Sequence, residues 1–214
     1  MESVKDYKKE CRDLYLPKTG PALIDVPELP FAAVEGTGNP NEENGAYQKA
    51  TELLYGIQYT IKMSKKGNAK IAGYFDYVVP PLEGLWWFHN NEKVMPRDKS
   101  GFVWISLIRL PEFAGEAVFA WACEEAAKKK HIETRRAKYL KIREGLCVQC
   151  MHLGPYDGES ETIKRIDTFI TEHGLVNDIS ETRHHHEIYL SDPRKTEPSK
   201  MKTVLRIPVK RAGG

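Results

Sequence analysis

The chain has 214 residues, of which 41% are hydrophobic and 29% charged, so it holds enough apolar material to bury a sizeable core. Lysine and arginine number 32 and aspartate and glutamate 30, which leaves a formal charge of +2. So small a bias gives no reason to expect nucleic acid or an anionic membrane as a partner. The first ten residues contain no apolar stretch, and the longest apolar run, 102–108, is too short to cross a bilayer. We therefore expect a soluble, unexported, cytoplasmic protein.

In the first half, a charged lead-in over residues 1–26 precedes an apolar run, Phe31–Gly36, which predicts a short strand and turn. Apolar residues with helical spacing predict a helix from Asn41 through about residue 61. Aromatic and β-branched segments then predict three strands, at Tyr74–Val79, Leu82–Phe88 and Phe102–Leu110. A polar segment, 89–101, joins the last two strands, and a second helix is expected over 112–130.

In the second half the same order of elements returns. Leu146–Leu153 predicts a strand that ends at Gly154 and Pro155, and Asp157–His173 predicts an amphipathic helix. Two closing strands are expected at His185–Leu190 and Thr203–Val209.

This repeat predicts an α+β fold made of two strand-helix-strand-strand modules with antiparallel sheets and helices on one side. The modules are expected at about 27–110 and 143–210, joined by the 112–130 helix. We expect them to meet around a pseudo-two-fold axis and to leave a ligand cleft between them.

Two patterns raise the question of a metal site. Cys147 and Cys150 have the two-residue spacing of zinc sites, but residues three apart in a strand point to opposite faces. Of the three consecutive histidines 184–186, only His184 and His186 share a strand face. The chain also has no phosphate-binding glycine loop and no Gly-x-Ser-x-Gly elbow. We expect no metal and no cofactor.

Aromatic residues are the first candidates for a ligand site. Trp86 and Trp87 are adjacent in a predicted strand, so one ring must face away from the core. Trp104, Tyr156 and Tyr189 also lie on predicted strands or turns. Any one of these rings could instead simply fill the core, as aromatic residues commonly do.

The segment 182–191 contains the candidate for proton chemistry. As a strand, it places His185, Glu187 and Tyr189 on one face, and Ile188 and Leu190 on the face expected to pack against helices. A carboxylate among aromatic rings is partly desolvated, and we expect Glu187 to exchange a proton there. The alternative is a solvent-exposed glutamate on an edge strand.

At these residues the sequence resembles the GyrI-like small-molecule-binding family, in its branch of stand-alone proteins. The resemblance covers nearly the whole chain and rests on six motifs: Leu14–Lys18, Glu35–Pro40, Pro81–Trp86, Glu144–Gln149, His152–Tyr156 and Glu187–Lys195. It implies a tandem pair of SHS2-like modules with a hydrophobic cleft between them.

The resemblance also implies a function. In relatives that bind lipophilic, often cationic drugs, a glutamate contacts the ligand at the position matching Glu187. Stand-alone members resemble enzymes that hydrolyse the cyclopropane ring of yatakemycin- and duocarmycin-type genotoxins, a detoxifying role. We expect Glu187 to be catalytic, as general base or general acid, and a flat hydrophobic molecule to contact Glu83, Trp86, Trp104, Tyr156 and Tyr189. The alternatives are sequestration of lipophilic cations, or gyrase inhibition with a topoisomerase as partner.

Overall fold

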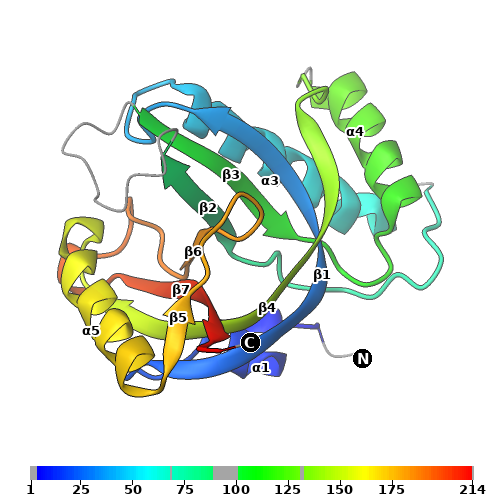
Figure 1. Cartoon of the computed structure of the whole chain (residues 1–214). Helices are drawn as coiled ribbons and strands as arrows, with labels where there is room; N and C mark the ends of the chain where they lie inside the picture. The colour runs from blue at the N-terminus through cyan, green and yellow to red at the C-terminus, as the bar shows by residue number, and fades with distance from the viewer. Residues whose placement is uncertain (1–3, 68, 89–100, 131–132, 214) are drawn as a thin grey trace. The chain divides into compact units, whose positions relative to one another are not determined.

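The computed structural model describes residues 4–67, 69–88, 101–130 and 133–213 (Figure 1). The predicted polar connection at 89–101 lies outside these residues except for its last residue. The chain divides into two compact units whose segments alternate along the sequence. The first unit consists of Met1–Tyr7, Leu29–Leu82 and Trp87–Ile142, and the second of Lys8–Glu28, Glu83–Trp86 and Arg143–Gly214.

The first unit is built on the pairing of β1 (Ala22–Thr37) with β3 (Phe102–Arg109). The pairing is antiparallel, with Gly36 opposite Trp104, and β3 lies between β1 and β2 (Leu82–Phe88) in the strand order. Helix α3 (Ala46–Met63) contacts β3 and also α4 (Glu116–Lys130), as Figure 1 shows. The strands predicted at 82–88 and 102–110 are therefore confirmed.

The strand predicted at Tyr74–Val79 is wrong, because this segment makes only an isolated bridge between Tyr77 and Lys5. Side chains of α3 hold the segment instead of a strand ladder. The Lys62 ammonium donates to the Tyr77 carbonyl and lies 3.4 Å from an Asp76 carboxylate oxygen, and the Tyr77 hydroxyl donates to the Gln58 carbonyl at 3.4 Å. An apolar, aromatic composition matches such a packed irregular segment as well as it matches a strand.

The second unit is a sheet with one long helix. Its strands are β5 (Leu175–Asn177), β6 (His185–Tyr189) and β7 (Lys202–Arg211), together with the residues of β2 and of β4 (Ala137–Leu153) that belong to this unit. Strand β7 pairs antiparallel with β4, β5 and β6, and β6 lies between β7 and β2. The predicted strands at 146–153, 185–190 and 203–209 are confirmed.

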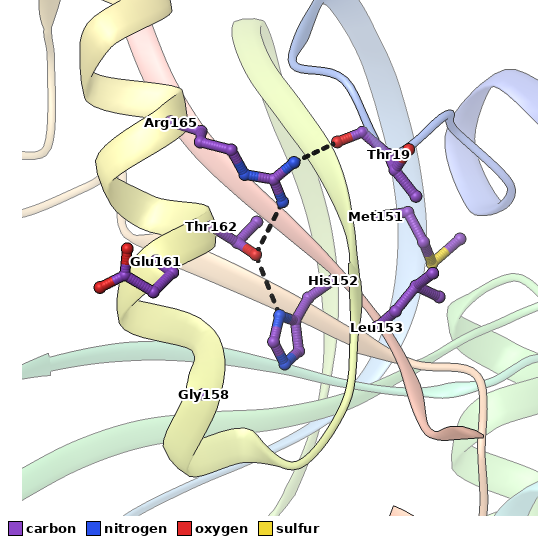
Figure 2. Close-up of a pocket in the computed structure, with 8 residues that line it drawn as sticks. All are labelled: Thr19, Met151, His152, Leu153, Gly158, Glu161, Thr162 and Arg165. Carbon is purple, nitrogen blue, oxygen red and sulfur yellow. Dashed lines mark hydrogen bonds between the residues drawn. The ribbon is translucent and has the colours of Figure 1, made fainter. Parts of the chain in front are cut away.

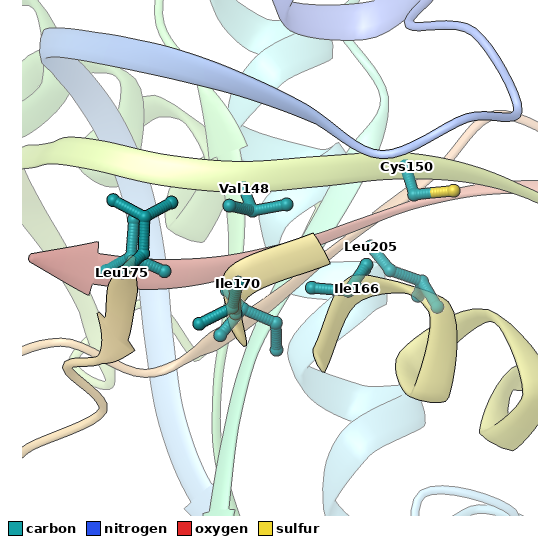
Figure 3. Close-up of a cluster of buried hydrophobic side chains, with 8 residues drawn as sticks. Val148, Cys150, Ile166, Ile170, Leu175 and Leu205 are labelled. Carbon is teal, nitrogen blue, oxygen red and sulfur yellow. The ribbon is translucent and has the colours of Figure 1, made fainter. Parts of the chain in front are cut away.

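Helix α5 (Glu159–Glu172) packs on β5 and β7 and encloses the core of the second unit (Figure 3). The buried side chains of this cluster are Val148, Cys150, Ile166, Ile170, Leu175, Leu205, Ile207 and Val209. Gly174 follows the C-terminal end of the helix, and its φ of 64° is a left-handed conformation that glycine adopts at little cost.

Five short helices complete the described part of the chain: α1 (Tyr7–Glu10), α2 (Arg12–Tyr15), η1 (Ser64–Lys66), η3 (Tyr156–Gly158), which leads into α5, and η4 (Pro198–Lys200). The mixed helix and strand class with antiparallel pairing is confirmed. The element order β1-α3-β2-β3 is followed by β4-α5-β5-β6-β7, but the pseudo-two-fold relation and the cleft stay predictions. Among the described residues, no helix combines the length and hydropathy that a bilayer crossing requires.

Candidate functional site

Glu187 ends a directed chain of hydrogen bonds in the second unit. The Trp86 indole Nε1–H donates to the Tyr189 hydroxyl at 2.9 Å, and that hydroxyl donates to Glu187 Oε2 at 2.7 Å. The direction is fixed because an indole nitrogen only donates, and a phenol has a single proton to give. Glu187 Oε2 is therefore an acceptor, and a proton taken up by this carboxylate goes to Oε1.

Two further rings surround this chain. The imidazole Nε2 of His185 lies 3.2 Å from Glu187 Oε1, and both side chains are nearly buried. The Tyr156 ring meets the Tyr189 ring edge to face, with centroids 5.7 Å apart. Burial first, and then the nearby carboxylates of Glu159, Glu187 and Asp192, raise the pKa of Tyr156 to about 12. The Tyr156 hydroxyl is thus neutral at physiological pH and able to donate.

Gly84 leaves the space in which this chain forms. A Cβ atom added at Gly84 would lie 2.5 Å from the Trp86 indole nitrogen and 3.0 Å from the Tyr189 hydroxyl. Any side chain here would displace the Trp86 ring or the Tyr189 hydroxyl. The glycine in the Pro81–Trp86 motif therefore has a direct structural role in the site.

The shared face of His185, Glu187 and Tyr189 is confirmed, since the first and third both contact the Glu187 carboxylate. The face assigned to the helix is wrong. Glu187 pairs directly with Leu205 on β7, and Leu205 belongs to the core that α5 covers. Directly opposite residues of antiparallel strands project to the same side. Ile188 is fully buried on the other side of β6, so both faces of this strand are covered. The alternation of apolar residues along β6 therefore does not reveal which face α5 covers.

Glu83 belongs to a different group, on the opposite face of β2 from Trp86. Its Oε2 lies 2.9 Å from His186 Nε2, and its Oε1 accepts from the Tyr15 hydroxyl at 3.3 Å. On its other side, His186 Nδ1 lies 2.9 Å from Glu144 Oε2, and Glu144 Oε1 accepts from Arg206 at 2.6 Å. We call Glu83, Glu144, His186 and Arg206 the buried ion cluster; its two carboxylates balance its two cations.

Arg206 also ties the N-terminal segment of the second unit to the sheet. Its guanidinium donates to the Leu14 carbonyl at 2.9 Å and to the Gln149 side-chain oxygen at 3.1 and 3.2 Å. Gln149 in turn donates to the Asp13 carbonyl at 2.5 Å. The motifs Leu14–Lys18 and Glu144–Gln149 therefore meet at one arginine, and sequence reasoning missed it. A charge inside the apolar run of β7 was the available signal, because a buried charge requires a partner.

The ion cluster shifts the titration of its members. Burial alone would lower the pKa of His186, but the carboxylates of Glu144 and Glu83 outweigh it and raise the pKa to about 9. Burial likewise pushes the pKa of Glu144 upward, but Arg206 and His186 hold it well below its usual range. Both groups are therefore charged at neutral pH.

We expect the free energy of unfolding to fall as pH rises from about 6.5 to about 9. The folded state binds the His186 proton more tightly than the unfolded chain does. The contribution of this proton to the free energy of unfolding is therefore complete below the pKa of His186 in the unfolded chain. It is lost as the pH rises through the pKa of His186 in the folded protein. The urea midpoint of wild type should decline across this range. The midpoint of the control variant His173→Gln, which changes an exposed histidine, should decline in parallel. A midpoint that stays constant or increases up to pH 9 would contradict the charged state of His186.

Trp104 lies in the first unit and is fully buried. Its ring packs over Gly36, where an added Cβ would lie 2.3 Å from the ring, and meets Tyr47 edge to face at 5.0 Å. The structure therefore brings Trp86, Tyr156, Tyr189 and Glu187 together in one unit. It places Glu83 in the ion cluster, Trp104 in the core of the other unit, and Trp87 half-buried in that unit.

A hollow of about 430 Å³ lies at the start of α5 (Figure 2). His152 borders it, with Nδ1 3.0 Å from the Thr162 hydroxyl and Nε2 3.0 Å from the Pro155 carbonyl. Since a carbonyl only accepts, Nε2 donates and Nδ1 accepts, and Thr162 receives a further bond from Arg165 at 3.0 Å. These contacts hold the loop that carries Tyr156, and none of the candidate site residues lines the hollow.

Cys147 and Cys150 lie buried on β4 as free thiols, and Cys150 donates to the Thr19 carbonyl at 2.9 Å. Within the described ranges, no group of three or more histidine, cysteine or acidic residues is arranged to hold a metal ion.

The sequence profile of the GyrI-like small molecule binding domain matches residues 20–210. The chain belongs to the GyrI-like family. Among curated proteins, none matches this sequence.

Solved structures similar to this GyrI-like chain agree with that assignment. A hydrolase from Listeria innocua is 47% identical, with 96% of this chain and 100% of that chain covered and a TM-score of 0.88. An uncharacterized conserved protein from Listeria innocua is 48% identical over the same shares, with a TM-score of 0.90. The C-terminal domain of EcmrR is 13% identical, with 90% and 98% covered and a TM-score of 0.51, and this likeness shows the fold alone.

Proposed function

We propose that this GyrI-like protein hydrolyses the cyclopropane ring of flat, lipophilic cyclopropanoid genotoxins, with Glu187 as the catalytic residue. The observation that carries the proposal is the carboxylate of Glu187, held by the Trp86–Tyr189 chain beside the Tyr156 ring. The 47% identity to a Listeria protein described as a hydrolase supports the reaction class. A detoxifying role in the cytoplasm follows from this proposal.

The arrangement favours general base chemistry over general acid chemistry. Glu187 Oε2 accepts the Tyr189 hydrogen bond, which leaves Oε1 to take a proton from water. Water attacks the ring methylene, a carbon–oxygen bond forms, and the strained carbon–carbon bond breaks. Its electron pair moves into the conjugated dienone, which becomes a phenolate, and the water proton goes to Glu187. In this proposal Tyr156, a neutral donor, stabilises the oxygen that gains charge.

Non-catalytic binding of lipophilic cations is the second candidate. An ionised carboxylate beside Trp86, Tyr156 and Tyr189 offers a counter-charge and cation–π contacts. A binder of this kind would prefer cationic to neutral compounds of the same shape, and gyrase inhibition would need a topoisomerase partner and no small molecule.

The experiment that separates these functions is turnover of a neutral spirocyclopropane dienone, followed by chromatography and mass spectrometry. The proposal predicts a ring-opened alcohol in excess of the protein concentration. Recovery of only the intact compound, together with tighter binding of cationic analogues, would establish a binder instead.

The Trp86 ring should contribute to affinity for flat compounds. Trp86→Ala removes both the ring and the donor to Tyr189, and we expect binding to weaken by about 1–3 kcal/mol. Isothermal titration with a flat apolar compound measures this effect, and Trp121→Ala, which changes a ring on α4, serves as the control. Equal affinity of wild type and Trp86→Ala for the compound would show that Trp86 does not contribute to the binding site.

We also propose that residues 27–110 and 143–210 are two copies of one module. Each range contains a helix between strands, α3 in the first and α5 in the second. Superposition of the two ranges in a crystal structure tests this, and helices on opposite sheet faces would reject it.

A further inference from the structure

The three consecutive histidines have separate surroundings. His186 belongs to the buried ion cluster, whereas His185 lies on the opposite face of β6 and contacts Glu187. The His185 side chain is 12% exposed, and its Nδ1 is buried without a hydrogen-bond partner in the described part of the chain. One imidazole nitrogen therefore lies on a carboxylate, and the other has no hydrogen-bond partner among the described residues.

The two oxygens of Glu187 are not equivalent. Oε2 accepts from Tyr189, whose proton is fixed by the Trp86 donor, so this oxygen is already engaged. Oε1 is the oxygen on which Glu187 takes a proton, and His185 Nε2 is the group 3.2 Å away from it.

We propose that His185 is the positioning residue of Glu187, whose Oε1 it holds for the proton that the carboxylate takes from water. This inference rests on the proposed hydrolysis. In the resting protein, Nε2–H holds Oε1 and keeps the carboxylate oriented toward its ligand. After water attacks, Oε1 takes the proton on its free lone pair and then releases it to solvent. The phenolate product takes a proton from solvent, so the sum is addition of one water and no oxidation.

The titratable groups around His185 are consistent with this role. Glu187 faces it directly from its own strand, and the Tyr189 hydroxyl lies on the far oxygen of that carboxylate. Tyr156, from η3, packs on Tyr189, and its pKa of about 12 keeps it neutral over the range of an activity assay. The carboxylates of Glu159 and Asp192 act on Tyr156 and complete the charged surroundings.

The test compares His185→Gln, His185→Ala and the neighbouring His184→Gln in the full chain, with a neutral spirocyclopropane dienone as the probe. Glutamine keeps an N–H donor for Oε1, whereas alanine removes it. We expect His185→Ala to bind the probe within about threefold of wild type and to turn it over about 10- to 100-fold more slowly, because a misplacement of a reactive group by about 1 Å can cost about 100-fold. His185→Gln should recover most of the wild-type rate. His184→Gln should keep the wild-type rate.

A second readout separates the hydrogen bond to Oε1 from general structural support. Added imidazole should restore part of the activity of His185→Ala, in proportion to its concentration, and should leave wild type unchanged. Wild-type turnover by His185→Ala while Glu187→Gln is inactive would overturn the role of His185 and leave the proposed function intact. A wild-type protein without turnover, or an active Glu187→Gln, would overturn the proposed function and this inference with it.

Discussion

Replacing Glu187 with glutamine should lower the rate of spirocyclopropane hydrolysis by roughly 10²–10⁴, the usual contribution of a positioned acid–base group. Glutamine has nearly the same shape as glutamate, and its side-chain oxygen still accepts from Tyr189. The hydrogen bonds from Trp86 to Tyr189 and from Tyr189 to the side chain at position 187 are therefore kept. The amide takes no proton from water at the Oε1 position. Binding of the neutral dienone should therefore stay within a few fold while single-turnover rates fall.

The matched control is Glu181→Gln, because Glu181 is an exposed glutamate shortly before β6. It should keep both affinity and rate. Glu83→Gln addresses the other acidic candidate, and its first effect should be on stability, since Glu83 pairs with His186 in the ion cluster. Full hydrolysis by Glu187→Gln would show that Glu187 is not the catalytic residue, and Glu83 would become the next candidate.

Replacing Arg206 with methionine should destabilise the protein by about 3–5 kcal/mol, the usual cost of removing one partner from a buried ion pair. The substitution leaves Glu144 buried beside a single cation, His186, and two further acceptors, Gln149 and the Leu14 carbonyl, lose their donor. Methionine fills much of the same volume, so the loss is electrostatic rather than a packing defect. Chemical denaturation followed by far-ultraviolet circular dichroism measures it.

Arg211→Met is the control for this variant. Arg211 lies on the same strand but is exposed, and its replacement should change the free energy of unfolding by no more than about 0.5 kcal/mol. Equal stability of Arg206→Met and Arg211→Met would show that the buried ion cluster contributes nothing net to stability.

Local sequence patterns were enough for elements whose signal is strong within a few residues. The helix expected over 157–173 is α5, and the strands expected at 82–88, 185–190 and 203–209 are β2, β6 and β7. The length of each element was harder to predict from the sequence. Strand β1 begins at Ala22 and continues through Pro27 and Pro30, because proline removes a donor yet keeps a φ compatible with extended backbone. A short apolar run therefore located this strand without giving its extent.

In the candidate site, too, contacts within one strand could be predicted from the sequence, whereas contacts between strands could not. Alternation along β6 gave the shared face of His185, Glu187 and Tyr189, and the same rule separates Glu83 from Trp86, which are three apart on β2. The ion cluster required knowledge of which strands are neighbours. Its members come from β2, β4, β6 and β7, and only strand pairing brings them together.

The most direct test of Glu187-dependent water addition is mass spectrometry of the product formed in water labelled with heavy oxygen. Wild type and Glu187→Gln are incubated with the same neutral spirocyclopropane dienone for the same time. The account predicts a wild-type product that is heavier by one labelled water molecule, and almost none of it from Glu187→Gln. An unlabelled product, no wild-type product, or equal labelled product from both proteins would contradict it.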